Sequence, residues 1–297
     1  MDNEPLLWSK QTEIDFFRSA LKLTTPETLF YKTSDKRYYA YWPKSYNGTK
    51  YTLQARNAYI GDFTEKFCVD LLKNYAETRN LFAVQSVICN EIGLTPQSPA
   101  DIAICKTSDR IQQPKNIVAL FEAKMSIVWN WELIKGNSTF ELNCLGSYNT
   151  HQGNPSLLRS DSMLKAIGKS ITVRVSSFQA SRIPIIIFGN TPISIQYVTK
   201  VDHLRTSGII QGFWSLNPKP LDDTLTPKQS PKNCFIRMDS YSELVKYLDS
   251  LFISQSEFFS GMLPEIELGK IIELANMEVG YISKAQKFLN FIRGHNE

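Results

Sequence analysis

Three side chains, Asp101, Glu122 and Lys124, have the types and spacing that metal-assisted hydrolysis needs. Asp101 begins one apolar segment, after Pro99 and Ala100, and Glu122 ends another, 117–121. Two carboxylates at a shared strand end can hold Mg²⁺, which prefers a few carboxylates together with waters and phosphate oxygens. The Lys124 ammonium could then hold and help deprotonate a water, while the metal neutralises charge that develops on a phosphate.

The alternative interpretation of Glu122 and Lys124 is an exposed ion pair at a strand end. An acid and a lysine two positions apart also occur by chance. The apolar context favours the site, because burying such charges without a metal or a partner is costly.

The elements that position these residues are three strands, expected at 82–89, 101–106 and 117–124, with a polar turn at 107–116. If Cys105 lies opposite Val118, Asp101 falls opposite Glu122, at the same end of a hairpin. Residues two apart on a strand point to the same side, so Glu122 and Lys124 share a face.

The rest of the chain predicts one compact α/β unit, 1–297, with a central mixed β-sheet flanked by helices. Before the strands, we expect an arm at about 1–55, rich in Tyr, Trp, Lys and Arg from 32 to 59, and an amphipathic helix from about 61 to 75. After them, we expect a Gly/Asn-rich loop at 136–153, a helix at 155–169, a β-rich stretch at 171–176 and a buried strand at 183–188. A surface loop is expected at 218–232. Two further helices are expected at 240–252 and 264–292, within a helical C-terminal region of about 236–297.

Composition excludes several classes of protein. The 297 residues are 42% hydrophobic, enough for a sizeable core, and the five cysteines form no CxxC pair, which favours reduced, mostly buried thiols over a zinc ribbon or a disulfide framework. The net charge of +4 permits a local basic surface. The N-terminus lacks a secretory layout and no apolar run is long enough for a membrane span, so we expect a soluble, cytoplasmic protein. The phosphate-binding GxxxxGK[ST] loop and the GxSxG elbow are absent.

The two segments 99–104 and 120–124 resemble the motif of the PD-(D/E)xK nuclease superfamily. The stretches 54–61, 91–94 and 153–161 also look like sequences of bacterial type II restriction endonucleases, and this likeness spans about residues 50 to 200. The resemblance implies a restriction-endonuclease-like core at about 56–200, and Mg²⁺ bound by Asp101, Glu122 and the main-chain carbonyl of Ala123. It assigns Lys124 to the attacking water. Ala100 separates Pro99 from Asp101, where the name of the motif writes the two side by side.

Glu65 is a candidate fourth catalytic residue. In the superfamily a helix before the hairpin often adds a glutamate, and Glu65 shares a helical stripe with Val69 and Leu72, at the edge of the core-facing arc. The alternative is a glutamate in the first turn of a helix, favoured there by the helix dipole.

Residues for DNA binding are expected in two further places. Lys165 and Lys169 are four apart in the helix expected after Pro155, a spacing suited to phosphate contacts or to a merely solvated basic face. The polar loop and the segment 37–56 carry side chains suited to base edges or to the sugar-phosphate backbone; in the loop these are Tyr148, Asn149, His151, Gln152 and Asn154.

The expected function is therefore Mg²⁺-dependent, site-specific hydrolysis of double-stranded DNA by a bacterial type II restriction endonuclease. A symmetric site cut on both strands calls for two active sites, so a homodimer is expected, with a cognate DNA methyltransferase as functional partner and no membrane association. The alternatives are a repair or junction-resolving nuclease of the same fold, and a non-catalytic DNA-binding or scaffold protein.

Overall fold

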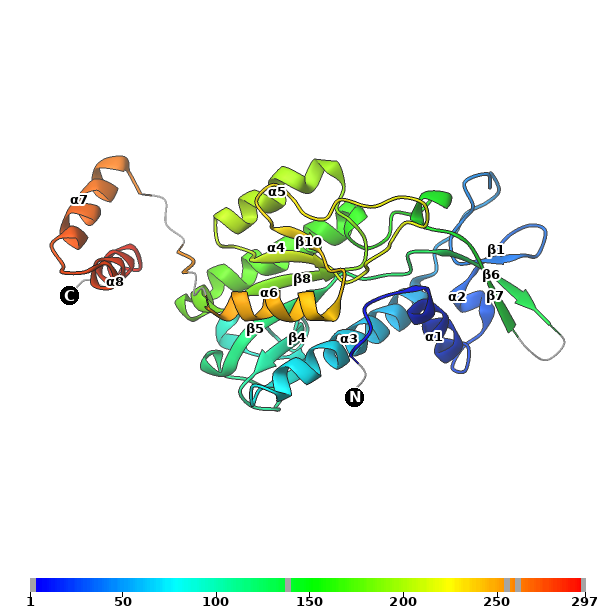
Figure 1. The fold of residues 1–297 in the computed structure, drawn as a ribbon, viewed down its shortest axis with the longest axis horizontal. Coiled ribbons are helices and arrows are strands. Elements are labelled where there is room, and N and C mark those ends of the chain that lie inside the picture. The colour runs from blue at the N-terminus through cyan, green and yellow to red at the C-terminus, as the bar shows by residue number, and fades with distance from the viewer. Residues whose placement is uncertain (1–3, 137–139, 254–256, 260–262, 295–297) are drawn as a thin grey trace.

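A six-stranded mixed sheet forms the centre of the computed structural model, which describes residues 4–136, 140–253, 257–259 and 263–294 (Figure 1). Its order is β10-β9-β8-β5-β4-β3. The strands β3, β4 and β5 pair antiparallel, whereas β5, β8, β9 and β10 run parallel. Their bounds are β3 Phe82–Val87, β4 Ala100–Cys105, β5 Ile117–Ala123, β8 Ile185–Gly189, β9 Gly212–Ser215 and β10 Phe235–Arg237.

The four strands predicted in this sheet are confirmed to within two residues at either end. Ile102 lies opposite Phe121, so the acids Asp101 and Glu122 are the next residues outward on the two strands. The other end of the hairpin differs from the prediction, because Cys105 lies opposite Ile117 rather than Val118. A β-bulge there takes up one extra residue and leaves the register near the acids unchanged.

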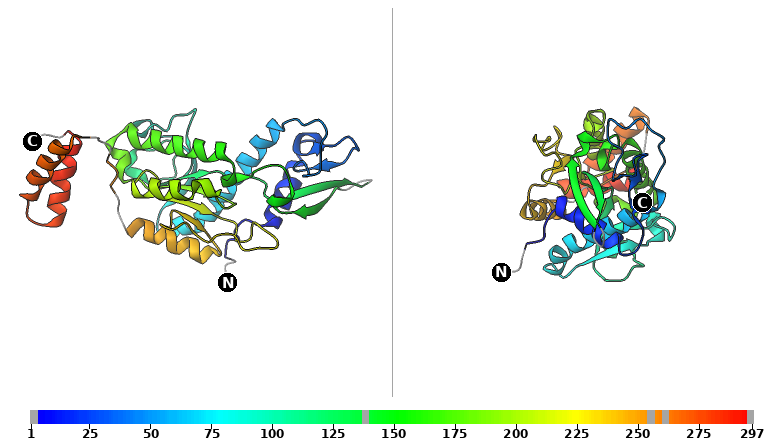
Figure 2. Two further views of the ribbon diagram at one scale, coloured as in Figure 1. Left: turned by 90° about the horizontal axis from the view of Figure 1, so that it is seen from above. Right: turned by 90° about the vertical axis from the view of Figure 1, so that its right-hand side faces the viewer.

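Helices cover both faces of the sheet, as predicted, in three layers (Figures 1 and 2). Ile102, Ile104 and Phe121 belong to the core on the side of α3 and α6, whereas Ala103 and Leu120 belong to the core on the side of α4 and α5. This alternation follows from the period of two along a strand. The helices are α3 Gln54–Glu77, α4 Ser160–Ser176, α5 Ile195–Thr206 and α6 Tyr241–Ile253.

A second, four-stranded antiparallel sheet, β1-β2-β6-β7, lies at one end of the molecule with two N-terminal helices (Figure 1). Glu13 joins the two parts of this end, since its buried carboxylate accepts hydrogen bonds from the Trp131 indole at 2.7 Å and the Val128 amide at 2.6 Å. The elements are α1 Lys10–Ala20, α2 Pro26–Leu29, β1 Tyr31–Lys32, β2 Tyr38–Tyr39, β6 Asn130–Lys135 and β7 Phe140–Gly146. The loop predicted at 136–153 is therefore wrong over β7, while 137–139 lie outside the described residues.

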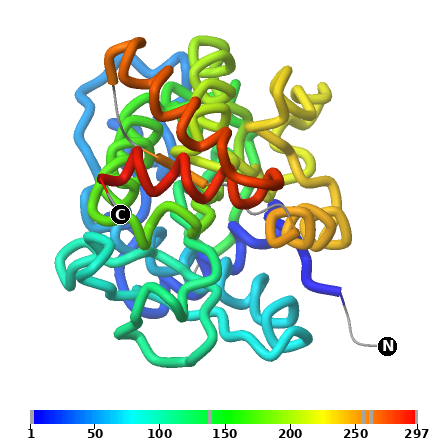
Figure 3. The backbone as a smooth tube through the Cα atoms, turned by 90° about the vertical axis from the view of Figure 1, so that its left-hand side faces the viewer, coloured from blue at the N-terminus to red at the C-terminus, as the bar shows by residue number. Residues whose placement is uncertain are grey.

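Two helices, α7 Glu265–Asn276 and α8 Tyr281–Ile292, form a pair at the opposite end of the molecule (Figures 1 and 3). The sequence predicted one helix over 264–292. The chain instead turns at 277–280, where Gly280 takes a left-handed backbone conformation with φ 88°, which glycine adopts without steric cost.

The β-rich stretch predicted at 171–176 is also wrong, because α4 continues to Ser176. Val173 on this helix is buried in the core. The packing of the helix against the core therefore outweighs the preference of β-branched residues for strands. Short 3-10 turns complete the fold: η1 Asn90–Ile92, η2 Pro114–Asn116, η3 Tyr148–Thr150, η4 Ser156–Leu158 and η5 Phe178–Arg182.

All five cysteines are free and four of them are buried, as predicted. No helix within the described ranges has both the length and the apolar character needed to cross a membrane.

Candidate active site

Asp101 and Glu122 lie side by side where β4 begins and β5 ends, on the face of the sheet that α4 covers. Oδ2 of Asp101 accepts a hydrogen bond from the Ala123 amide at 2.8 Å, which fixes this carboxylate against the neighbouring strand. Both side chains are mostly buried, with exposed fractions of 17% for Asp101 and 10% for Glu122. Two negative charges this close and this buried need compensating cations.

Lys124 supplies one of these cations. Its Nζ lies 2.5 Å from Oε1 of Glu122 and 3.7 Å from Oδ2 of Asp101. The Ala123 carbonyl is 3.4 Å from the same nitrogen, so all the residues of the predicted motif meet at one place.

The main chain of Lys124 is held by groups that the sequence analysis did not identify. Its amide donates to the Phe188 carbonyl at 2.7 Å, which continues the parallel pairing of β5 with β8. Its carbonyl accepts a hydrogen bond from the hydroxyl of Ser156 at 2.6 Å, and the oxygen of that hydroxyl accepts a hydrogen bond from the amide of Asn190 at 3.0 Å. Gly189 permits this arrangement, because a Cβ there would lie 2.4 Å from the side chain of Leu157.

Lys169 supplies the second cation and was predicted for a different role. Its Nζ lies 3.1 Å from Oδ1 of Asp101 and 2.5 Å from Oε2 of Glu122, so it bridges the two acids. Its side chain is only 22% exposed, whereas that of Lys165 is 71% exposed and pairs with Asp161 at 3.1 Å. The two lysines therefore do not form one solvated basic face.

The charges in this cluster act on the pKa values of Glu122 and Lys169. Burial raises the pKa of Glu122, and the charge of Asp101 raises it further, against Lys124 and Lys169, which lower it. Burial lowers the pKa of Lys169, but the charges of Glu122 and Asp101 outweigh that effect and leave it above its usual value. Lys169 is therefore an ammonium ion at neutral pH.

Glu65 faces inward from α3, on the other face of the sheet from α4. Its Oε2 accepts a hydrogen bond from the side-chain amide of Gln85 on β3, at 2.9 Å, and Gln85 is a residue that the sequence analysis did not single out. Burial raises the pKa of Glu65, and the charges of Asp101 and Glu122 act in the same direction. The charges of Asp101 and Glu122 therefore act on Glu65, whereas its side-chain hydrogen bond is with Gln85.

The donor set of Asp101 and Glu122 suits a hard divalent cation. Oδ1 of Asp101 and Oε2 of Glu122 converge on one ammonium group, which shows that the two oxygens can share a cation. Within the described part of the chain, no three or more His, Cys, Asp or Glu side chains gather as a metal-binding group. A metal here would therefore rest on these two acids, the Ala123 carbonyl, and oxygens from water or substrate.

The loop residues predicted to contact DNA have different surroundings. Asn149, Gln152 and Asn154 are exposed. The side-chain amide of Gln152 donates to the carbonyls of Pro43 and Tyr46, at 2.8 and 2.9 Å, so it holds the N-terminal arm.

His151 is 3% exposed and is therefore poorly placed to contact a base edge. Its ring stacks on Tyr41 with centroids 3.9 Å apart, and its Nε2 lies 3.2 Å from the Val128 carbonyl. Burial lowers the pKa of His151 to about 4, and the nearby charge of Arg56 contributes in the same direction. The interpretation of His151 as a DNA contact is replaced by a packing role.

This burial predicts acid sensitivity. The unfolded chain takes up a proton on His151 near its ordinary pKa of about 6.5, whereas the folded chain resists protonation down to about 4. Stability should therefore fall as pH decreases through this window, by about 2 kcal/mol from this residue between about pH 7 and pH 5. Urea unfolding followed by fluorescence at both pH values measures the loss.

His151→Phe keeps an aromatic ring on Tyr41 and removes the titrating group, so its stability should depend less on pH. His203→Phe, at an exposed position of α5, is the matched control and should keep the wild-type dependence. An equal dependence in wild type and His151→Phe would disprove the assignment.

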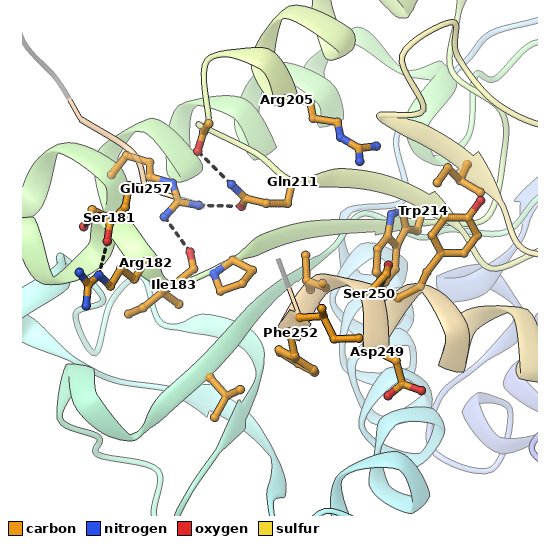
Figure 4. A pocket seen from close by; sticks show the side chains of 18 of the residues that line it. Ser181, Arg182, Ile183, Arg205, Gln211, Trp214, Asp249, Ser250, Phe252 and Glu257 are labelled. Carbon is orange, nitrogen blue, oxygen red and sulfur yellow. Dashed lines mark hydrogen bonds and ion pairs between the residues drawn. The ribbon is translucent and has the colours of Figure 1, made fainter. Parts of the chain in front are cut away.

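A large cavity, about 1440 Å³, lies away from the acids, at the edge of the sheet where β5 and β8 begin (Figure 4). Its buried Arg174 already donates to the Ala180 carbonyl, to the Ile183 carbonyl at 2.7 Å and to Gln211 at 2.7 Å. Its Arg182 pairs with Glu257. The cations that line this cavity are satisfied by protein groups, so the cluster around Asp101 is the better candidate for chemistry.

No protein-family model matches this sequence, and neither the curated proteins nor the solved structures include a match to it. Its functional assignment therefore depends on the residues of the site.

Proposed function

We propose that this protein is a Mg²⁺-dependent endonuclease with a restriction-endonuclease-like core, which hydrolyses phosphodiester bonds of double-stranded DNA at specific sequences. The observation that carries the proposal is the buried pair of Asp101 and Glu122 at adjoining strand ends, with Lys124 beside it. This combination matches the chemistry of metal-assisted phosphodiester hydrolysis.

Asp101, Glu122 and Lys124 have separate tasks in this proposal. Asp101 and Glu122 would hold Mg²⁺, with help from the Ala123 carbonyl. When bound, Mg²⁺ supplies charge neutralisation on the phosphate and a lowered pKa for a bound water. The Lys124 ammonium, which lies next to Glu122, orients the attacking water. Hydrogen bonds with Ser156 and Phe188 hold the main chain of Lys124 in place.

Sequence-specific cutting rests on the resemblance to restriction endonucleases, and it implies a homodimer, because a symmetric site is cut on both strands by two active sites. The exposed Asn149 and Asn154 remain candidates for DNA contact in this proposal. A cognate DNA methyltransferase would protect the host DNA at the same sequence, in a bacterial cytoplasm.

Digestion of unmethylated phage DNA tests the proposal directly. Purified protein with Mg²⁺ should give discrete fragments whose ends share one sequence, and a chelator of divalent metal should stop the reaction. Cleavage of branched DNA alone would point to a junction-resolving nuclease instead. DNA binding without cleavage in Mg²⁺ or Mn²⁺ would point to a binding protein, and activity in the chelator would contradict the mechanism.

A further inference from the structure

Lys169 lies on the core-facing side of α4. It follows the buried Ala166 by three residues and precedes the buried Val173 by four, so the three share one helical stripe. The long methylene chain carries its ammonium from this stripe to the edge of the sheet, where it contacts both acids.

The two acids are oriented by partners other than Lys169. The second oxygen of Asp101 is engaged by the Ala123 amide, and the second oxygen of Glu122 is engaged by Lys124. The oxygens that remain, Oδ1 and Oε2, point to one common position, which the Lys169 ammonium occupies. That position suits a cation held by two carboxylates.

Without a metal, the two carboxylates would repel one another in a poorly solvated place. Lys169 offsets this repulsion, and with Lys124 it brings the formal charge of the four side chains to zero. A divalent cation at the same oxygens would meet the positive charge of Lys169 at close range. The two cations therefore exclude one another.

We propose that Lys169 is a tethered counter-cation that occupies the divalent-metal position of Asp101 and Glu122, so that a metal ion binds only when the ammonium leaves. This inference rests on the proposed metal site and adds a residue that limits its affinity. Lys169 is a positioning residue in this scheme, since its ammonium bridges the two carboxylates and balances their charge until the metal arrives.

Binding of Mn²⁺ to the full-length protein, followed by electron paramagnetic resonance and calorimetry without DNA, tests the proposal. Lys169→Met removes the charge and keeps most of the apolar stem, so Mn²⁺ should bind about tenfold more tightly, equivalent to about 1.4 kcal/mol. Lys165→Met, one turn earlier on an exposed position, is the matched control and should keep the wild-type affinity. Adding Asp101→Asn to Lys169→Met should remove the gain.

Thermal unfolding supplies a second measurement on the same variants. Lys169→Met should unfold at a lower temperature than wild type without metal, because the acids lose a cation, and Mn²⁺ should raise its unfolding temperature by more than it raises that of wild type. Lys169→Gln repeats both measurements in a second side chain of similar length.

Mn²⁺ affinity equal to or lower than wild type in both folded Lys169 variants overturns the proposal while leaving the metal site intact. Absence of Mn²⁺ binding in wild type and in both variants overturns the metal site as well. A gain that persists after Asp101→Asn places the metal elsewhere and equally rejects the inference.

Discussion

Asp101→Asn protein is expected to cleave DNA at least about a thousand-fold more slowly than wild type in saturating Mg²⁺, because it lacks one of two charged metal ligands. The asparagine keeps the shape of the side chain, and its carbonyl oxygen can still accept the Ala123 amide that now binds Oδ2. The substitution therefore removes charge with little change in packing. Single-turnover cleavage of a plasmid, with enzyme in excess, measures the rate.

The same variant should bind DNA at least as tightly as wild type. The four side chains of the cluster carry two positive and two negative charges, so loss of one carboxylate leaves them with a net positive charge next to the expected path of the phosphates. Binding measured in Ca²⁺ or without metal separates this effect from cleavage. Asp161→Asn, at an exposed position in the first turn of α4, is the control and should cut normally.

A folded Asp101→Asn protein that cut plasmid DNA at the wild-type rate would reject the assignment. Glu122→Gln should behave similarly, with a larger loss of stability, since Glu122 is the more buried acid and lies closer to both lysines than Asp101 does. Agreement between the two variants would locate the metal between β4 and β5.

The sequence predicted the strands of the hairpin because each is a short apolar run ended by polar residues. It also predicted Asp101 opposite Glu122, from an assumed pairing of Cys105 with Val118, and the register at the acids agrees with that prediction. The error at Cys105 came from a bulge, whose extra residue has no clear signature in one sequence. Local patterns thus determined the geometry of the predicted motif.

Side chains that meet through tertiary contacts could not be predicted in this way. Ser156 and Asn190 are distant from Lys124 in sequence, and each looks like an ordinary loop residue until the chain folds. Gln85 contacts Glu65 across the gap between a strand and a helix. Such contacts depend on how helices, strands and loops pack together. The pattern of hydrophobic residues along the chain does not indicate which polar side chains will meet.

Lys169 is an intermediate case. Its spacing from Lys165 suggested one basic face, but residues four apart on a helix differ in direction by roughly 40°. That angle is enough to separate a lysine on the core stripe from one in solvent. The spacing from Ala166 and Val173 contained the signal, and only the position of the acids shows why a charged residue is tolerated on that stripe.

Lys124→Met is expected to reduce the cleavage rate by roughly a hundred-fold or more, because the attacking water loses the ammonium group that orients it. The substitution removes the ion pair with Glu122 but should leave the strand in place, because the main chain of residue 124 keeps its hydrogen bonds with Phe188 and Ser156. Quenched-flow cleavage under single-turnover conditions, over a range of Mg²⁺ concentrations, measures the rate separately from metal affinity.

The comparison with Lys169→Met decides which lysine acts on the water. Lys124 contacts Oε1 of Glu122, whereas Lys169 contacts Oε2. In the proposed scheme, Lys124 therefore stays in place when a metal binds and Lys169 leaves. Lys124→Met should therefore stay slow at every Mg²⁺ concentration, since its defect is in the reaction. Full activity of Lys124→Met together with an inactive Lys169→Met would reverse the two roles. In that case Lys169 on α4, rather than Lys124 of the sequence motif, would orient the attacking water.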